Sequence, residues 1–124
     1  MPMLSSLIPE EFVIVQKFSP KTLPPSALLD PKLLLERAQG WWVIDPNKVI
    51  FTTRLITLYQ GQIIADFHIG DTIKFKDDAA GHKRIHIELS PISNSPLLGR
   101  EVHDIARWPI RRLNCNDVEV LPQS

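Results

Sequence analysis

The sequence predicts an α+β protein built on a mostly antiparallel, curved sheet, with one short helix early in the chain and one late. Three observations support this prediction. Strand-like runs follow one another between residues 55 and 89 with only short polar turns between them. Helix signals occur on either side of these runs, at residues 31–39 and 97–106. The sequence lacks the pattern of alternating βαβ units, so a curled sheet or small barrel, which leaves few bare edges, is expected.

The first predicted strand covers residues 12–15, where aromatic and β-branched side chains precede a proline-rich loop at 19–25. A helix is predicted over residues 31–39. Its signals are Asp30 as the N-cap, Pro31 at the first helical position and Gly40 as the stop. Residues 41–44 then run extended or finish the helix, and residues 45–47 predict a turn.

The middle of the chain predicts a meander of antiparallel strands. Residues 55–59 and 63–69 flank Gln60 and Gly61, which predict a hairpin turn. The second run alternates with period two, which places one set of side chains on a polar face and the other in the core. The polar set is Gln62, Ile64, Asp66 and His68, and the core set is Ile63, Ala65, Phe67 and Ile69. The same alternation predicts strands at 72–76 and 84–89.

The last third of the chain predicts a loop at residues 90–96, the late helix at 97–106 and a final strand within 111–120. We expect residues 1–10 and 121–124 to be frayed tails. A length of 124 residues fits one domain, because it is enough for one core and too short for two.

The composition limits which binding partners and which cellular compartment are expected. The 14 Lys and Arg residues balance the 14 Asp and Glu residues, so no long-range positive field draws the chain to a nucleic-acid backbone or to an anionic membrane. Cys115 is the only cysteine, which excludes an internal disulfide and fits a reducing compartment, the cytoplasm. The first residues do not read as a signal peptide, and no apolar run is long enough to span a bilayer.

Two sets of side chains are candidates for chemistry on the predicted sheet. Asp66 with His68, and His86 with Glu88, each lie two residues apart on one strand and therefore point the same way. If their strands are neighbours, the four form a carboxylate and imidazole cluster suited to general acid and base work or to a metal. The alternative is a solvated salt-bridge network, which half-exposed sheets commonly carry.

Trp41 and Trp42 are candidates for base stacking. In an extended segment neighbouring side chains face opposite sides, so at most one of these rings is fully in the core. Arg37, Arg54 and Tyr59 are candidates to bind a phosphate or a base edge beside them. The alternative is that both rings are structural anchors.

A basic and aromatic cluster lies at residues 107–112 and contains Arg107, Trp108, Arg111 and Arg112. Such a cluster can hold a phosphate locally. Glu101 and Asp104 lie close by in the sequence, so internal ion pairing is the alternative.

Four segments together resemble small PUA-like β-barrel modules related to the EVE and ASCH groups, similar modules of which are fused to nucleases in bacterial defence systems. They are LLERAQGWWVI at 34–44, TLYQGQIIADFHI at 57–69, LLGREV at 97–102 and PIRRLN at 109–114, and the resemblance spans residues 33–114. It implies a pseudo-barrel with a cleft that binds nucleic acid or a flipped modified base. It also implies that Arg37, Trp41, Trp42 and Tyr59 line this cleft.

The leading hypothesis is therefore a non-catalytic module without cofactor or metal that binds nucleic acid, DNA or RNA, or a modified base by aromatic stacking and arginines. A second hypothesis is a homodimeric or other protein interaction module with an apolar interface near Leu97 and Leu98. A third is a small metal-assisted hydrolase or nuclease that uses the carboxylate and imidazole cluster.

Overall fold

The computed structural model describes residues 2–103 and 109–121. The strands are β1 (Phe12–Phe18), β2 (Gly40–Trp42), β3 (Arg54–Tyr59), β4 (Gln62–Asp77), β5 (Lys83–Pro91) and β6 (Ile110–Asn114). The helices are α1 (Pro31–Gln39) and α2 (Pro46–Ile50), and short 3-10 turns occur at η1 (Leu4–Ser6), η2 (Pro25–Leu29) and η3 (Cys115–Asp117). No helix in the described ranges is long and apolar enough to cross a membrane.

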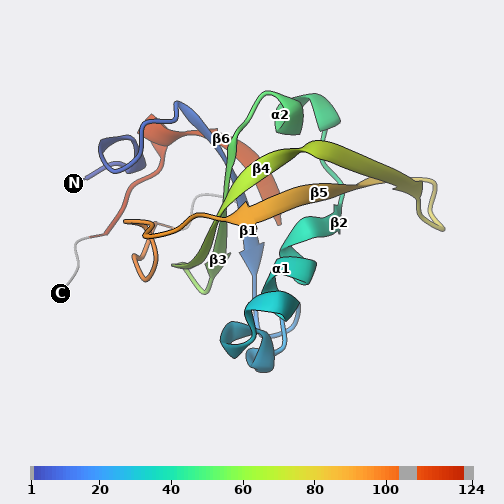
Figure 1. The fold of residues 1–124 in the computed structure, drawn as a ribbon, viewed down its shortest axis with the longest axis horizontal. Coiled ribbons are helices and arrows are strands. Elements are labelled where there is room, and N and C mark those ends of the chain that lie inside the picture. Colours follow the sequence, from blue (N-terminus) through green and yellow to red (C-terminus); the bar gives the residue numbers. More distant parts are fainter. Residues whose placement is uncertain (1, 104–108, 122–124) are drawn as a thin grey trace.

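The strands form one curled, mixed sheet in the order β2-β5-β4-β3-β1-β6 (Figure 1). The predicted α+β class with a curved, mostly antiparallel sheet is confirmed. One pair differs from a pure meander, because β1 and β3 run parallel. A parallel pair needs a long crossover connection, and here α1, β2 and α2 supply it. β4 and β5 continue past β3 as a long two-stranded ribbon, at the right of Figure 1, and β2 pairs with β5 along it.

The early helix and the central hairpin form as predicted, from local signals. Asp30 caps α1 by accepting hydrogen bonds from the backbone N–H groups of Lys32 and Leu33. Gln60 and Gly61 both have positive φ, at 50° and 82°, as the tight turn between β3 and β4 requires. α2 occupies a segment predicted only as a turn, although its N-cap Asp45 and first-turn Pro46 repeat the signals that start α1.

The predicted late helix is wrong for residues 97–103, and the rest of that prediction falls outside the described residues. Within this segment the backbone makes one turn hydrogen bond, from Arg100 N–H to Leu97 O, and it also pairs with the start of β4 and the turn before it. Ile63 N–H donates to Arg100 O at 2.8 Å, and Val102 N–H donates to Gly61 O at 2.9 Å. Val102 also forms a bridge with Val120, so this segment fills an edge position that a helix would leave empty.

The sheet has an apolar core on each face. The helix face, covered by α1 and α2, carries Ile14, Leu55 and Ile85. The terminal face, covered by the two ends of the described chain, carries Val13 and Ile56. This division follows from the alternation of side chains along β1 and β3.

The N-terminal segment is packed rather than frayed. Leu4 and Ile8 are buried in the terminal-face core, and Leu4 N–H donates to Val118 O at 2.7 Å. At the other end, Leu121 N–H donates to Glu101 O at 2.8 Å, and the remainder of the predicted C-terminal tail falls outside the described residues. Apolar side chains at positions 4, 7 and 8 explain why the segment folds onto the sheet.

A bulge in the β3–β4 pair splits the predicted core set between the two faces. The register shifts between Thr57 and Leu58, so Ile63 packs on the terminal face while Ala65 and Phe67 pack on the helix face. All three are buried, as the alternation predicted. Asp66, predicted on the polar face, is buried as well, and its partners are described below.

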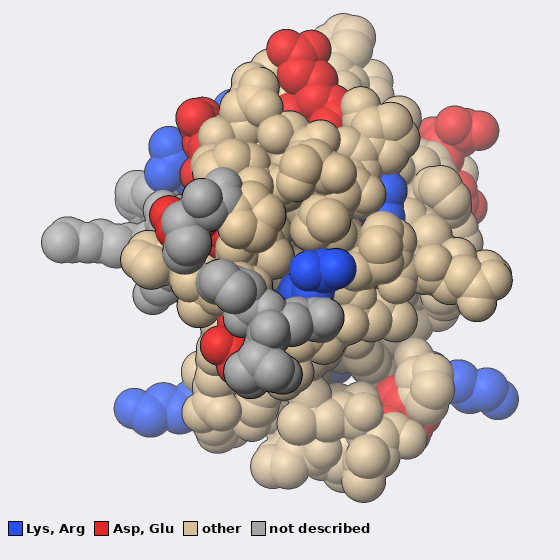
Figure 2. Space-filling model, turned by 90° about the vertical axis from the view of Figure 1, so that its left-hand side faces the viewer, with Lys and Arg blue, Asp and Glu red and all other residues tan. Residues whose placement is uncertain are grey.

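Coverage of the terminal face is incomplete. Its core contains residues of β1 and β3 and Ile63 at the start of β4, but none of β2 or β5. The uncovered part of this face carries Lys74 and Lys76 on β4 and Arg84 and His86 on β5, paired in register across the two strands. In contrast, the side of the molecule that bears the chain ends shows charges of both signs scattered among uncharged residues (Figure 2).

Candidate nucleic-acid interface

Arg54, predicted to bind nucleic acid, belongs to a buried ionic network on the terminal face. Its Nε donates to Asp66 Oδ1 at 2.9 Å, and its Nη1 donates to Glu10 Oε1 at 2.8 Å. Ser95 Oγ donates to Asp66 Oδ2 and accepts from Leu97 N–H. Burial by itself lowers the pKa of Arg54, but the hydrogen bonds and charges of Asp66 and Glu10 outweigh it and raise the pKa. With its guanidinium engaged in this way, Arg54 has a structural role.

The two tryptophans face opposite sides, as the extended backbone predicted. Trp42 packs against the helix-face core, its indole N–H donates to Ala38 O at 2.8 Å, and its ring lies 5.5 Å from that of Phe18. Trp42 is therefore an anchor between β2 and α1. Trp41 lies on the uncovered part of the terminal face, with its ring centroid 5.3 Å from that of His86.

Basic side chains surround Trp41. The Lys76 Nζ lies 4.6 Å from the centroid of the Trp41 ring, a cation–π distance, and Lys74 lies opposite His86 on the neighbouring strand. Arg84, opposite Lys76, places its Nη1 at 3.4 Å from Trp41 O. We call Trp41, Lys74, Lys76, Arg84 and His86 the Trp41 platform. It combines one partly exposed aromatic ring with three cations and an imidazole.

The charges of the platform are only partly compensated. Asp78 pairs with Arg84 at 2.8 Å, and this hydrogen bond, with those from the backbone N–H groups of His82 and Ala80, lowers the pKa of Asp78 to about 2. Asp78 is therefore charged at neutral pH and neutralises Arg84. Lys74 and Lys76 have no carboxylate partner in the described part of the chain, so they stay available to an anionic ligand.

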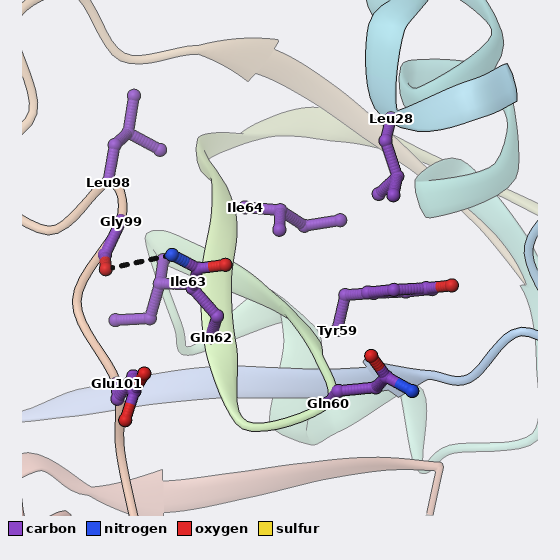
Figure 3. Close-up of a pocket in the computed structure, with 9 residues that line it drawn as sticks. All are labelled: Leu28, Tyr59, Gln60, Gln62, Ile63, Ile64, Leu98, Gly99 and Glu101. Carbon is purple, nitrogen blue, oxygen red and sulfur yellow. Dashed lines mark hydrogen bonds between the residues drawn. The ribbon is translucent and has the colours of Figure 1, made fainter. Parts of the chain in front are cut away.

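Tyr59 lies in a different place, in a hollow of about 510 Å³. Its ring lies between Leu28 and Gln60, and across the hollow the Gln62 side chain donates to Gly99 O at 3.1 Å (Figure 3). A neighbouring hollow of about 270 Å³ shares Leu28 and has a mainly apolar lining. Leu98, expected in an apolar interface, is exposed beside both hollows, whereas Leu97 is buried.

The remaining predicted residues lie elsewhere. Arg37 is exposed in the last turn of α1, the helix that covers the opposite face of the sheet from Trp41. Arg111 and Arg112 lie together on β6 and line a third hollow, of about 340 Å³. Arg107 falls outside the described residues. The predicted residues thus lie on several separate surfaces and do not form one site.

The predicted carboxylate and imidazole cluster does not assemble. β4 and β5 are neighbours, as the prediction required, but Asp66 is held by Arg54 and Ser95. His68 lies opposite Ser90 and His86 opposite Lys74, four residues apart along β5, or about 13 Å. No group of three or more His, Cys, Asp or Glu side chains suited to hold a metal occurs within residues 2–103 and 109–121.

Cys115 is fully buried in the terminal-face core. Burial, with a smaller contribution from the charge of Glu10, raises the pKa of its thiol to about 11, although Arg54 partly opposes this. Since only the thiolate reacts, we expect labelling by a disulfide reagent at pH 8 to be at least about 100-fold slower in the folded chain than in the unfolded chain. Absorbance during labelling, with and without denaturant, measures this ratio, and rapid labelling in native buffer would contradict the burial of Cys115.

Sequence reasoning singled out Trp41 but missed the lysines of the platform. The signal was present: alternation over residues 72–76 and 84–89 places Lys74, Lys76, Arg84 and His86 on the polar side of two neighbouring strands. What it lacked was the position of β2 beside β5, which brings Trp41 to the same place. No family model matches the chain, and neither a curated protein nor a solved structure matches it.

Proposed function

We propose that this protein is a non-catalytic module that binds a nucleobase or a short single-stranded nucleic acid on the Trp41 platform. The observation that carries the proposal is a partly exposed Trp41 ring, flanked by uncompensated lysines, on a part of the sheet that no described segment covers. Aromatic rings on sheet surfaces stack on any base, and adjacent cations bind the backbone. The Trp41 platform holds both elements within one group of contacts.

Lys76 has a double role in this proposal. In the free protein its ammonium lies over the Trp41 ring, 4.6 Å from the centroid. An incoming base takes that place, and the flexible side chain of Lys76 turns to the phosphate that follows the base. Stacking then replaces the cation–π contact, and the charge of Lys76 is compensated by the ligand.

The affinity depends weakly on salt. The whole chain has a formal net charge of zero, and only Lys74 and Lys76 are uncompensated on the platform. Two cations that contact a single strand give a slope of about −1.4 for log K against log salt concentration. Binding of this kind depends more on base stacking than on contacts to the backbone.

The PUA-like resemblance forms part of the proposal. A curled sheet with an early helix accords with the architecture that the resemblance implies. The binding surface proposed here differs from the implied cleft, because Trp41 and Trp42 face opposite sides of the sheet and Tyr59 lines a separate hollow.

Trp41→Ala tests the platform. Loss of one stacked base costs about 1–3 kcal/mol, so we expect affinity for a labelled single-stranded oligonucleotide, measured by fluorescence anisotropy, to fall about 5- to 150-fold. Phe51→Ala is the matched control, because Phe51 is an aromatic side chain that is 76% exposed elsewhere. Lys76→Gln is expected to reduce the magnitude of the salt slope by about 0.7.

Two results would contradict the proposal. One is a folded Trp41→Ala protein that binds DNA and RNA oligonucleotides as well as the unsubstituted chain does. The other is an equal loss of affinity in Phe51→Ala. Circular dichroism and a thermal melt of each variant show whether the fold is intact.

A further inference from the structure

We propose a second ligand site, a pocket for a phosphate or phosphomonoester dianion between α2 and β6. The pocket has a volume of about 340 Å³ and is lined by Val43, Ile44, Asp45, Lys48, Ile110, Arg111 and Arg112. This volume is at the lower end of the range for small-molecule sites, about 300–1,000 Å³. The site shares no residue with the Trp41 platform and does not rest on the function proposed there.

The pocket lies where the curled sheet fails to close. β2 and β6 are the two edges of the sheet, at opposite ends of the strand order. Val43 and Ile44, which directly follow β2, and the β6 residues Ile110 to Arg112 nevertheless line the same hollow. β2 and β6 are not paired with each other, so a ligand can enter the gap between these two edges.

Arg112 is held in position for an anion by contacts that leave its terminal nitrogens free. Its guanidinium carbon lies 3.8 Å from the centroid of the Phe12 ring, and its Nε donates to Thr52 Oγ1 at 3.0 Å. Thr52 Oγ1 in turn donates to Lys48 O at 2.6 Å, which ties the guanidinium to the last turn of α2. Neither Nη atom of Arg112 has a hydrogen-bond partner within the described ranges. A guanidinium fixed in this way loses little freedom when it binds a phosphate.

The charge of the pocket favours an anion. Lys48 is exposed and has no ion pair with any described residue, and Arg112 is the second cation. Arg111 contributes backbone to the lining, because it lies opposite Val15 of the terminal-face core and its side chain therefore points to the other face of β6. Asp45 is the one carboxylate in the lining, and its Oδ1 accepts from Asn47 N–H at 2.9 Å as the N-cap of α2. Two cations against one carboxylate leave the pocket with a net positive charge, which favours binding of a phosphomonoester at neutral pH.

The test uses the full chain and inorganic phosphate as the probe. At constant ionic strength, we expect saturable shifts of amide signals of α2 and β6 in an NMR titration. Lys48→Gln, at an exposed position, is expected to weaken phosphate binding at least about tenfold. Lys21→Gln and Arg37→Gln remove the same charges at exposed positions outside the pocket and are expected to leave binding unchanged.

A second measurement distinguishes a phosphate at the end of a nucleic acid from that of a small phosphomonoester. Tighter binding of a 5′-phosphorylated oligonucleotide than of its 5′-hydroxyl counterpart, lost in Lys48→Gln, supports the site with a nucleic-acid terminus as ligand. Saturable binding of phosphate alone, with no difference between the two oligonucleotides, supports the site with a small phosphomonoester as ligand. Absence of saturable binding in both measurements, or equal weakening by Arg37→Gln, overturns the proposal. Trp41→Ala leaves phosphate binding intact, so failure here is distinct from failure of the Trp41 platform.

Discussion

Replacement of Arg54 by methionine is expected to lower the free energy of unfolding by about 3–5 kcal/mol, a large part of the stability of a domain of this size. Arg54 and Asp66 are only 7% and 4% exposed. Without the guanidinium, the Asp66 carboxylate keeps one charge-neutral donor among the described residues, Ser95 Oγ, and Glu10 loses both of its hydrogen bonds to Arg54. A buried charge without a counter-charge is costly, and methionine fills the volume without supplying one.

Urea unfolding followed by tryptophan fluorescence measures this loss. Arg37→Met is the matched control, because Arg37 is exposed on α1, and its unfolding free energy should change by less than about 0.5 kcal/mol. The double variant Arg54→Met with Asp66→Leu removes both buried charges and is expected to recover part of the stability. A loss below about 1 kcal/mol in Arg54→Met would show that the network is hydrated rather than buried.

Leu4→Ala is expected to lower the free energy of unfolding by about 2–5 kcal/mol. Leu4 is fully buried in the terminal-face core, so truncation of its side chain removes apolar contacts and leaves a cavity against the sheet. Leu29→Ala makes the same chemical change at a side chain that is 90% exposed, and its effect should stay within about 0.5 kcal/mol.

The comparison of the two leucine variants tests whether the N-terminal segment is part of the folded core. Equilibrium unfolding in urea gives both values under the same conditions. Equal, small effects would place residues 2–8 outside the core, as expected for the frayed tail that the sequence alone predicts. A large effect of Leu4→Ala alone confirms that the segment seals the terminal face.

The features that the sequence by itself determined are local. Asp30, Pro31 and Gly40 set the bounds of α1, because caps and stops act within one helical turn. Gln60 and Gly61 set the β3–β4 hairpin through their positive φ angles. Alternation identified Ile63, Ala65 and Phe67 as buried side chains of β4, because adjacent side chains of a strand must point to opposite faces. It also showed that the side chains of Trp41 and Trp42 point to opposite faces of the sheet.

Only the tertiary structure decided which surface each diverging side chain meets. Trp42 packs against the core and Trp41 does not, since β2 joins the edge of the sheet beside β5 with α1 on one face only. Arg54 is buried because Asp66 and Glu10, 12 and 44 residues away in the chain, converge on it. The parallel β1–β3 pair and the pocket between α2 and β6 likewise join segments distant in sequence. Such contacts depend on chain topology, and neither periodicity nor capping signals encode them.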